Sequence, residues 1–457
     1  MTKTAKNMTL FALTWPIFIE LLLHMLMGNA DTLMLSQYSD ESVAAVGVSN
    51  QILSVIIVMF GFVAQGAAVL IAQNLGAEKE KTAGQIAMTS ISLNLMIALL
   101  LSAALYIWAV PILNIMDLPS EIMGEAKTYM QIVGGLIFVQ ALIMTTGAIL
   151  RSYGHTKDTM RVTIVMNILN VIGNYFVIFG PFGFPVLGVA GVAYSTAISR
   201  FIGFIALIFL LIKRTGEELD FASFYRYKKK QVKNLLQIGI PSAGEQLSYN
   251  ASQMVITYFI AQLGTVAITT KVYTQNIMMF IFLFSIAIGQ GSQILIGHMV
   301  GAGKTKDAYE RGIKSLRIAS LVSLCVAIVV FIFADQLLGI FTSDTSILEK
   351  GAILFAITII LEPGRAFNLV MINSLRAAGD VKFPVYIGII VMWGVGVTTA
   401  WFFALFLGLG LIGIWLSFIA DEWIRGIFMY RRWRKRRWAK MAFVEKKEYD
   451  PSNLRSS

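Results

Sequence analysis

The stretch WPIFIELLLHMLMGNADTLMLS, from Trp15 to Ser36, decides the fold class. It is long and apolar enough to cross a membrane, since about 20 helical residues at about 1.5 Å each span the hydrocarbon core. The same stretch carries Glu20, His24 and Asp31. At about 100° per residue, all three fall within about 40° of one another on the predicted helix. Ionisable groups inside a span normally face a partner or a water-filled cavity, so this face predicts an ion or substrate pathway. The alternative is a set of interhelical hydrogen bonds.

The composition extends this prediction to the whole chain. Of its 457 residues, 57% are hydrophobic and 14% are charged, and the mean hydropathy is +0.72. Soluble domains carry about 25% charged residues, so the chain is predicted to be an all-α integral membrane protein without a sizeable soluble domain. The lone Cys325 excludes an intramolecular disulfide, and we expect it to be a small core residue.

Apolar runs predict twelve transmembrane helices. The runs cover roughly 13–36, 45–72, 86–110, 128–150, 162–180, 190–212, 235–262, 267–299, 315–338, 352–374, 383–407 and 410–430. Lysine and arginine gather in every second loop and in the tail RRWRKRR from Arg431, while the loops between contain neither. The positive-inside rule then places both termini in the cytoplasm of a multi-pass protein, which we expect in the cell (plasma) membrane. The net charge of +11 reflects this topology and contact with anionic membrane lipids, so nucleic acid is not an expected partner.

An internal repeat divides the chain into two halves. Pro16 and Glu20 recur as Pro241 and Glu245, because 241 − 16 and 245 − 20 both equal 225. The same shift relates Gln65-Gly66 to Gln290-Gly291, Gly76 to Gly301, Arg151 to Arg376 and Gly154 to Gly379. Six spans per half make the repeat parallel, with its axis along the membrane normal, and such halves enclose a central cavity suited to alternating access.

The repeat predicts two six-helix bundles related by a pseudo-twofold. The amino-terminal lobe covers 1–212, a basic cytoplasmic linker 213–233, the carboxy-terminal lobe 234–430 and a basic cytoplasmic tail 431–457. After a shorter outer loop the shift drops to 222, which makes Arg200 and Glu422 repeat mates. An ion pair between the halves is a hypothesis that follows from their opposite charges.

Several motifs together resemble the multidrug and toxic compound extrusion (MATE) family. They are Pro16 opening the first span, DTLML from Asp31, the two QG pairs, MNILNVIGNYFVIFG from Met166, GVAGVAYSTAISR from Gly188 and LRAAGD from Leu375. The resemblance covers nearly the whole chain. It implies a transporter and not an enzyme: a secondary active antiporter that expels bulky, often cationic drugs and other organic compounds in exchange for Na+ or H+. We expect no cofactor beyond this coupling ion, no catalytic residues and a monomer.

The resemblance maps a cation site onto Asp31, Asn170 and Asn174, with a nearby hydroxyl at Thr196. The residues themselves agree, because Asn167, Asn170 and Asn174 form one polar stripe on an apolar helix. A carboxylate with amide oxygens suits a hard cation, and amides carry no proton. Several family members have aspartate where Asn174 stands, so the missing titratable group favours Na+ slightly over H+. Helix-to-helix hydrogen bonding is the alternative.

The carboxy-terminal half offers a second set of candidates. Glu245 shares a helix face with Tyr249 and Ser252 and is the candidate for proton or cation coupling there. Both Glu20 and Glu245 follow a proline, so the alternative is that each satisfies backbone amides freed by the kink. Further candidates for the substrate cavity, beside Glu20 and Tyr249, are His24, Gln51, Lys271, Gln275 and Glu362.

The predicted mechanism is mutually exclusive occupancy, in which cation binding or protonation at Asp31 releases the substrate outward. A related lipid-linked oligosaccharide flippase is the nearest alternative, but it would need a more cationic cavity, and spans 1, 2, 7 and 8 are poor in arginine. An exporter of an endogenous metabolite remains open, as does a channel or scaffold. A transferase acting on lipid substrates would need paired acids such as DxxD in a surface loop, which the sequence lacks.

Overall fold

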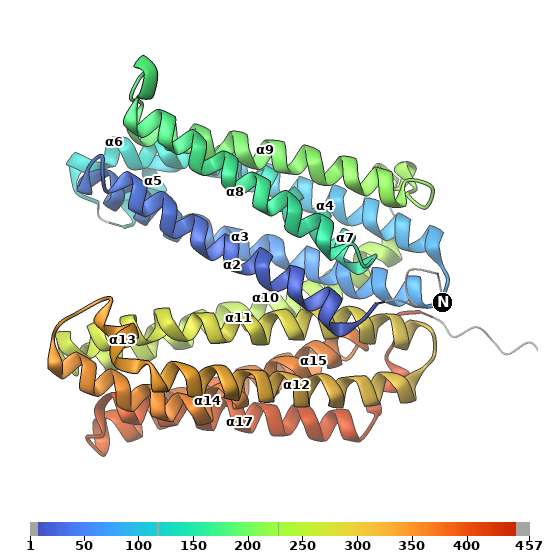
Figure 1. The fold of residues 1–457 in the computed structure, drawn as a ribbon. Coiled ribbons are helices and arrows are strands. Elements are labelled where there is room, and N and C mark those ends of the chain that lie inside the picture. The colour runs from blue at the N-terminus through green and yellow to red at the C-terminus, as the bar shows by residue number, and fades with distance from the viewer. Residues whose placement is uncertain (1–7, 117, 227, 445–457) are drawn as a thin grey trace, which may run out of the picture.

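The computed structural model describes residues 8–116, 118–226 and 228–444, and these are helical without a strand. The helices run lengthwise in two stacked bundles, an amino bundle and a carboxy bundle (Figure 1). The amino bundle consists of α2 (Leu10–Leu35), α3 (Asp40–Gly76), α4 (Glu80–Ile107), α5 (Ala109–Asn114), α6 (Ser120–Tyr129), α7 (Ile137–Ser152), α8 (Thr156–Phe179) and α9 (Gly188–Thr215). The carboxy bundle consists of α10 (Lys229–Ala261), α11 (Thr265–Gly301), α12 (Thr305–Ile332), α13 (Ala334–Gly339), α14 (Thr345–Ala377), α15 (Lys382–Val391), α16 (Thr398–Trp401) and α17 (Gly410–Arg434).

The predicted twelve-helix membrane fold is confirmed. Among the described residues, nine helical segments are long and apolar enough to cross a membrane, and the pair α6–α7, bent by 41°, forms a tenth. The eleventh predicted span runs from Lys382 to Phe406 through π-helical turns and is one of the nine. Helices α10 and α17 complete the twelve; α17 carries Asp421, Glu422 and Arg425 of the charged cluster described below. The first seven residues and the end of the predicted tail, 445–457, lie outside the described residues.

Local sequence signals set several helix ends. The Thr9 and Ser39 hydroxyls each accept a backbone N–H three residues later at 3.2 Å and cap α2 and α3. Gly154 and Gly379 follow α7 and α14 with φ of 89° and 96°, a conformation that costs glycine little. These two glycines are repeat mates, and the bounds of α3, α4 and α5 recur 225 residues later as those of α11, α12 and α13. The repeat in sequence is therefore a repeat in structure.

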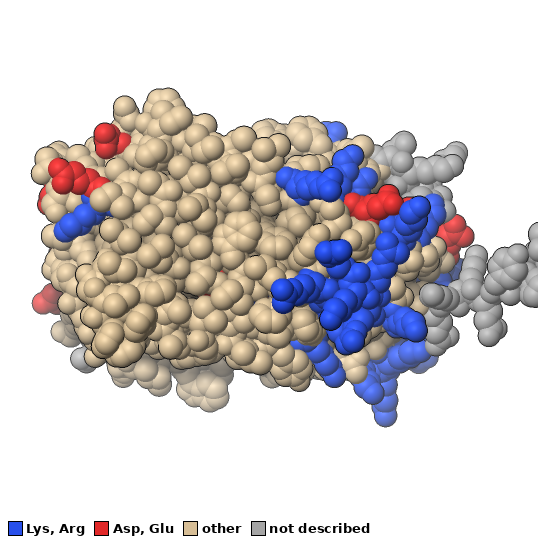
Figure 2. Space-filling view, turned by 90° about the horizontal axis from the view of Figure 1, so that it is seen from below, with Lys and Arg blue, Asp and Glu red and all other residues tan. Residues whose placement is uncertain are grey.

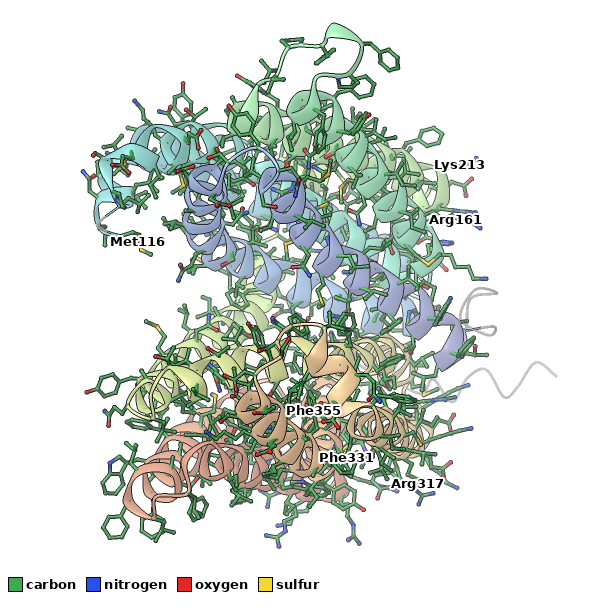
Figure 3. All side chains as sticks on the ribbon, turned by 60° about the vertical axis from the view of Figure 1, so that its left-hand side comes forward. Met116, Arg161, Lys213, Arg317, Phe331 and Phe355 are labelled. Atoms are coloured by element: carbon green, nitrogen blue, oxygen red, sulfur yellow. The ribbon has the colours of Figure 1, made fainter. Side chains whose placement is uncertain are left out.

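Basic side chains gather at one end of the molecule. Figure 2 shows lysine and arginine clustered there, beside a wide band without charged residues. Figure 3 places Arg161, Lys213 and Arg317 at this end and Met116 at the opposite one. We call it the basic end, formed by residues 77–82, 151–161, 213–226, 228–230, 302–317 and 431–440. Side chains such as Leu100 and Phe209, 71% and 62% exposed, cover the outside of the band and suit contact with lipid.

Cys325 corrects one prediction. It is exposed on α12 and is not a core residue. The apolar run around it covers the outside of the bundle, because a surface that faces lipid is as apolar as a core and hydropathy does not separate the two.

The two bundles meet most closely toward the basic end. A Cβ added to Gly76 would lie 2.0 Å from the His298 carbonyl oxygen, and one added to Gly301 would lie 1.9 Å from the Gln73 carbonyl oxygen. The Gln73 amide donates to the Ala377 carbonyl at 2.7 Å and accepts the Phe443 N–H at 2.8 Å. We call the contact of Gln73, Gly76, His298 and Gly301 the seal. Only glycine allows helices α3 and α11 to approach this closely.

Candidate functional site

A cavity of about 630 Å³ lies on the inner side of the amino bundle. Helices α2, α3, α6, α7 and α9 line it, and Gln290, Gln293 and Ile294 of α11 contribute from the carboxy bundle. The size suits an organic small molecule. Most of the lining is apolar, and the polar residues in it are Glu20, His24, Asp31, Asn50, Ser54, Gln65, Tyr129, Gln140, Arg151, Ser152, Arg200, Gln290 and Gln293.

One edge of the cavity carries the predicted cation residues, which the structure brings together. The Asn174 amide nitrogen donates to the Asp31 carboxylate at 2.6 Å and lies 3.5 Å from the side-chain carbonyl oxygen of Asn170. The Asn170 amide in turn donates to the Thr196 hydroxyl at 3.2 Å. Three helices, α2, α8 and α9, therefore deliver one continuous polar chain. Asp31 faces the cavity, while Asn170 and Asn174 are fully buried behind it.

The donor set of this chain fits a hard cation. The Asn174 side-chain carbonyl oxygen is buried, and no residue that the structure describes donates a hydrogen bond to it. A buried polar oxygen without a partner costs free energy, which a cation or a reoriented donor would recover. Asp31, Asn170, Asn174 and Thr196 would together supply carboxylate, amide and hydroxyl oxygens, the ligand types that Na+ takes from proteins. Asn167 lies outside this set, because its amide donates to the Leu23 carbonyl at 3.0 Å.

Glu20 and Glu245 are held by arginines in the same way in each bundle. The Arg151 guanidinium donates to Glu20 at 2.6 Å, and Arg376 pairs with Glu245. Each pair is 131 residues apart, as the repeat requires. Glu20 also accepts from the Thr159 hydroxyl at 3.0 Å. Within the described residues, both glutamates accept hydrogen bonds from side chains and not from the backbone amides of the proline kinks. Only the Glu20–Arg151 pair lines the cavity.

Glu362 belongs to a separate buried charge cluster in the carboxy bundle. Its carboxylate accepts from Arg365 at 2.6 Å, and Arg365 lies 3.5 Å from Glu422. Arg425 contacts Glu422 at 3.2 Å and also pairs with Asp421. Three carboxylates therefore share two guanidinium groups. The hypothesis of an ion pair between Arg200 and Glu422 is wrong, because Glu422 is paired inside its own bundle and Arg200 lies in the cavity of the other.

The remaining predicted cavity residues do not line this cavity. Gln51 and Gln275 are exposed, and Tyr249 is 37% exposed. The Lys271 ammonium donates to the Thr257 hydroxyl at 2.9 Å. Sequence reasoning misses Tyr129 and Gln140, which do line it. Tyr129 donates to the Asn50 side chain at 3.2 Å, and its place in a polar ten-residue helix gives no signal of that role.

Comparisons with known proteins agree along the length of the chain. A family model described as MatE matches residues 16–176 and 241–402, one segment in each bundle. The uncharacterized transporter YisQ of Bacillus subtilis is 59% identical over 95% of both chains. The probable multidrug resistance protein NorM of Thermotoga maritima is 30% identical over 93% of both. A crystal structure of a MATE transporter in its bent conformation superposes with a TM-score of 0.87 at 20% identity, covering 95% of this chain and 98% of that one.

Proposed function

Because this chain belongs to the MatE family of multidrug and toxic compound transporters, we propose that it is a secondary active antiporter that exports organic, often cationic compounds in exchange for Na+ or H+. The observation that carries the proposal is the position of Asp31. Its carboxylate faces a cavity of organic-molecule size and also ends the polar chain that passes through Asn174 and Asn170 to Thr196. One group thus belongs to both a substrate site and a cation site.

Competition for Asp31 couples the two fluxes. A cationic substrate in the cavity is attracted to the free carboxylate. A Na+ ion held by Asp31 and the amide oxygens, or a proton on Asp31, removes that charge and weakens substrate binding. By linkage the ion drives export only if its affinity differs between the inward-facing and outward-facing states. Asn174 adds an oxygen but no titratable group, which favours Na+ slightly.

The charge distribution supports an orientation with the basic end in the cytoplasm. Both chain termini would then be cytoplasmic and the chain would lie in the plasma membrane, in contact with anionic lipids and working as a monomer. In this orientation the seal closes the cytoplasmic side. The described conformation is then outward-facing, the state in which the coupling ion enters and the substrate leaves.

Efflux from proteoliposomes tests this proposal. We would load a fluorescent organic cation and impose a Na+ gradient or, separately, an H+ gradient, with wild type and Asp31→Asn. We expect export under one gradient by wild type and none by a folded, inserted Asp31→Asn variant. Equal export by both would remove Asp31 from the mechanism. No export by wild type under either gradient would overturn antiport of drugs and make lipid-linked oligosaccharide flipping the next function to test.

A further inference from the structure

Arg200 is a charged residue of the cavity that the coupling mechanism does not use. It lies on α9, one helical turn beyond Thr196, and lines the cavity with Asp31 and Tyr129. Its Nε is shielded from solvent and has no hydrogen-bond partner, and no ion pair within the described part of the chain includes its guanidinium. A guanidinium has five N–H donors and almost always finds acceptors when it is this enclosed.

Among the other charges of the cavity, only the Asp31 carboxylate compensates Arg200, and it does so without an ion pair. Four charged side chains line it: Glu20, Asp31, Arg151 and Arg200. Glu20 and Arg151 neutralise each other at 2.6 Å. Asp31 is engaged by Asn174, and it lies near enough to Arg200 to interact electrostatically but not to form an ion pair. When a cation or proton occupies Asp31, the cavity carries one uncompensated positive charge, that of Arg200.

We infer that Arg200 is a specificity-determining residue that binds an acidic group of the substrate, so that the cavity prefers compounds with a carboxylate or similar anion beside a cationic centre. A carboxylate accepts two parallel hydrogen bonds from a guanidinium, a pairing stronger than that of neutral groups. Such a compound places its anion on Arg200 and its cationic centre toward Asp31, and every charge in the cavity then has a partner. A purely cationic compound leaves Arg200 unpaired. The inference names the substrate class of the proposed antiporter and rests on that function.

The internal repeat supports a role for Arg200 outside the framework. Its repeat mate Glu422 accepts from the Asn368 amide at 2.8 Å and contacts Arg365 and Arg425, so it is fully engaged in holding α14 and α17 together. Arg200 holds no such network in the amino bundle. A structural arginine would be expected to bridge helices as Arg365 bridges α14 and α17, whereas Arg200 presents its donors to a cavity.

A matched pair of dyes tests the inference. Tetramethylrhodamine carries a carboxylate beside its delocalised cation, and its methyl ester lacks the negative charge but keeps the fluorophore. Binding to the purified protein would be measured by fluorescence anisotropy, without any gradient. We expect wild type to bind the acid about tenfold more tightly than the ester, as charge-assisted hydrogen bonds allow. Arg200→Gln should lose that preference through weaker binding of the acid, and Arg200→Lys should keep part of it.

The control is Arg161→Gln, the same substitution at a 68% exposed side chain of the basic end, which should leave both affinities unchanged. An equal loss of affinity for both dyes in Arg200→Gln would overturn the inference and show that Arg200 is structural. If Arg200→Gln does not fold, the inference is tested with wild type and Arg200→Lys. Wild type that binds the ester as tightly as the acid would also overturn the inference. Export of both dyes under the two gradients is measured separately. An Arg200-dependent preference without export would overturn antiport alone, and export without preference would overturn this inference alone.

Discussion

The amino and carboxy bundles share several helix bounds and one ion pair but differ at the positions of Asp31 and Asn174. Glu20–Arg151 and Glu245–Arg376 are repeat mates that join the same two helices in each bundle. Asp31, by contrast, has Ile256 as its mate, and Asn174 has Thr399. The polar chain that ends at a cavity in the amino bundle therefore does not recur at the corresponding positions of the carboxy bundle.

The carboxy bundle places its charges elsewhere. Glu362, Arg365, Asp421, Glu422 and Arg425 contact one another inside the bundle and do not line the cavity. Removing one partner of a buried ion pair is strongly destabilising, so we expect this cluster to keep α14 against α17. The duplicated fold thus keeps its shared pair as framework, while the amino bundle has the features of a cation and substrate site and the carboxy bundle those of a closed structural network. This division of roles can be broken by mutation.

The largest effect is expected in the carboxy network. Arg365→Gln leaves three buried carboxylates with one guanidinium and should lower the free energy of unfolding by about 3 to 5 kcal/mol. Glu362→Gln instead balances two carboxylates against two guanidiniums and should cost under about 1 kcal/mol. Thermal unfolding in detergent measures both. Equal melting temperatures for Arg365→Gln and wild type would contradict a structural role for the cluster.

The shared pairs come next. Glu20→Gln and Glu245→Gln each leave an arginine without its carboxylate partner. The side chains of these arginines, Arg151 and Arg376, are 20% and 15% exposed, so solvent partly screens the unpaired charge, and each variant should lose about 2 to 3 kcal/mol of the free energy of unfolding. Adding Arg151→Gln to Glu20→Gln, or Arg376→Gln to Glu245→Gln, should restore part of the lost stability. Stability is again read from thermal unfolding. A large loss in one bundle and none in the other would show that the pairs are not equivalent.

A third comparison isolates the polar chain. Asn174→Ala removes the amide that contacts Asp31 at 2.6 Å and should weaken binding of the coupling cation by about 1.5 to 3 kcal/mol, roughly 10-fold to 150-fold. Its mate Thr399→Ala loses only a hydroxyl that donates to the Val395 carbonyl of its own helix and should leave cation affinity unchanged. Isothermal titration with Na+ and at varied pH checks this. Equal losses of cation affinity in Asn174→Ala and Thr399→Ala would contradict the assignment of the cation site to the amino bundle alone.

The smallest effect concerns the seal between the bundles. Gly76→Ala forces a Cβ against the His298 carbonyl and should cost the described conformation about 1 to 2 kcal/mol, enough to shift a two-state equilibrium about tenfold. Gly47→Ala on the same helix meets nothing within 4 Å and is the control. Labelling of a cysteine introduced at the basic end, with Cys325→Ser as background, reports opening. Unchanged labelling in Gly76→Ala would show that the seal does not hold the state.

Hydropathy and the repeat were sufficient to predict the fold because both follow from the sequence directly. Twelve apolar runs and a constant shift predict two equivalent bundles without any knowledge of contacts. The same signals fail where lipid and core look alike, as at Cys325. They also fail between neighbours on a long helix: Asn50 lines the cavity, while Gln51, about 100° further round, does not.

The grouping of Asp31, Asn170, Asn174 and Thr196 could be predicted because a polar stripe on one helix and a lone acid on another have few places to meet. Pairing between distant helices could not. Arg151 reads as a loop charge that sets topology, yet it neutralises Glu20 inside the cavity. Opposite charges at Arg200 and Glu422 suggest a pair, yet the bundles keep them apart. Which partners meet depends on helix rotation, which composition and periodicity leave undetermined.

The most direct measurement of the central claim is ion release on substrate binding. Purified protein equilibrated with Na+ in weak buffer would receive tetraphenylphosphonium, an organic cation, while ion-selective and pH electrodes record the solution. Because linkage is reciprocal, a substrate that competes for Asp31 must expel the coupling ion. We predict release of about one Na+ or proton per protein by wild type and by Glu362→Gln, and none by Asp31→Asn. Ion release by Asp31→Asn would contradict the assignment of coupling to the amino bundle. So would the absence of ion release from Glu362→Gln when wild type and Asp31→Asn both release the ion.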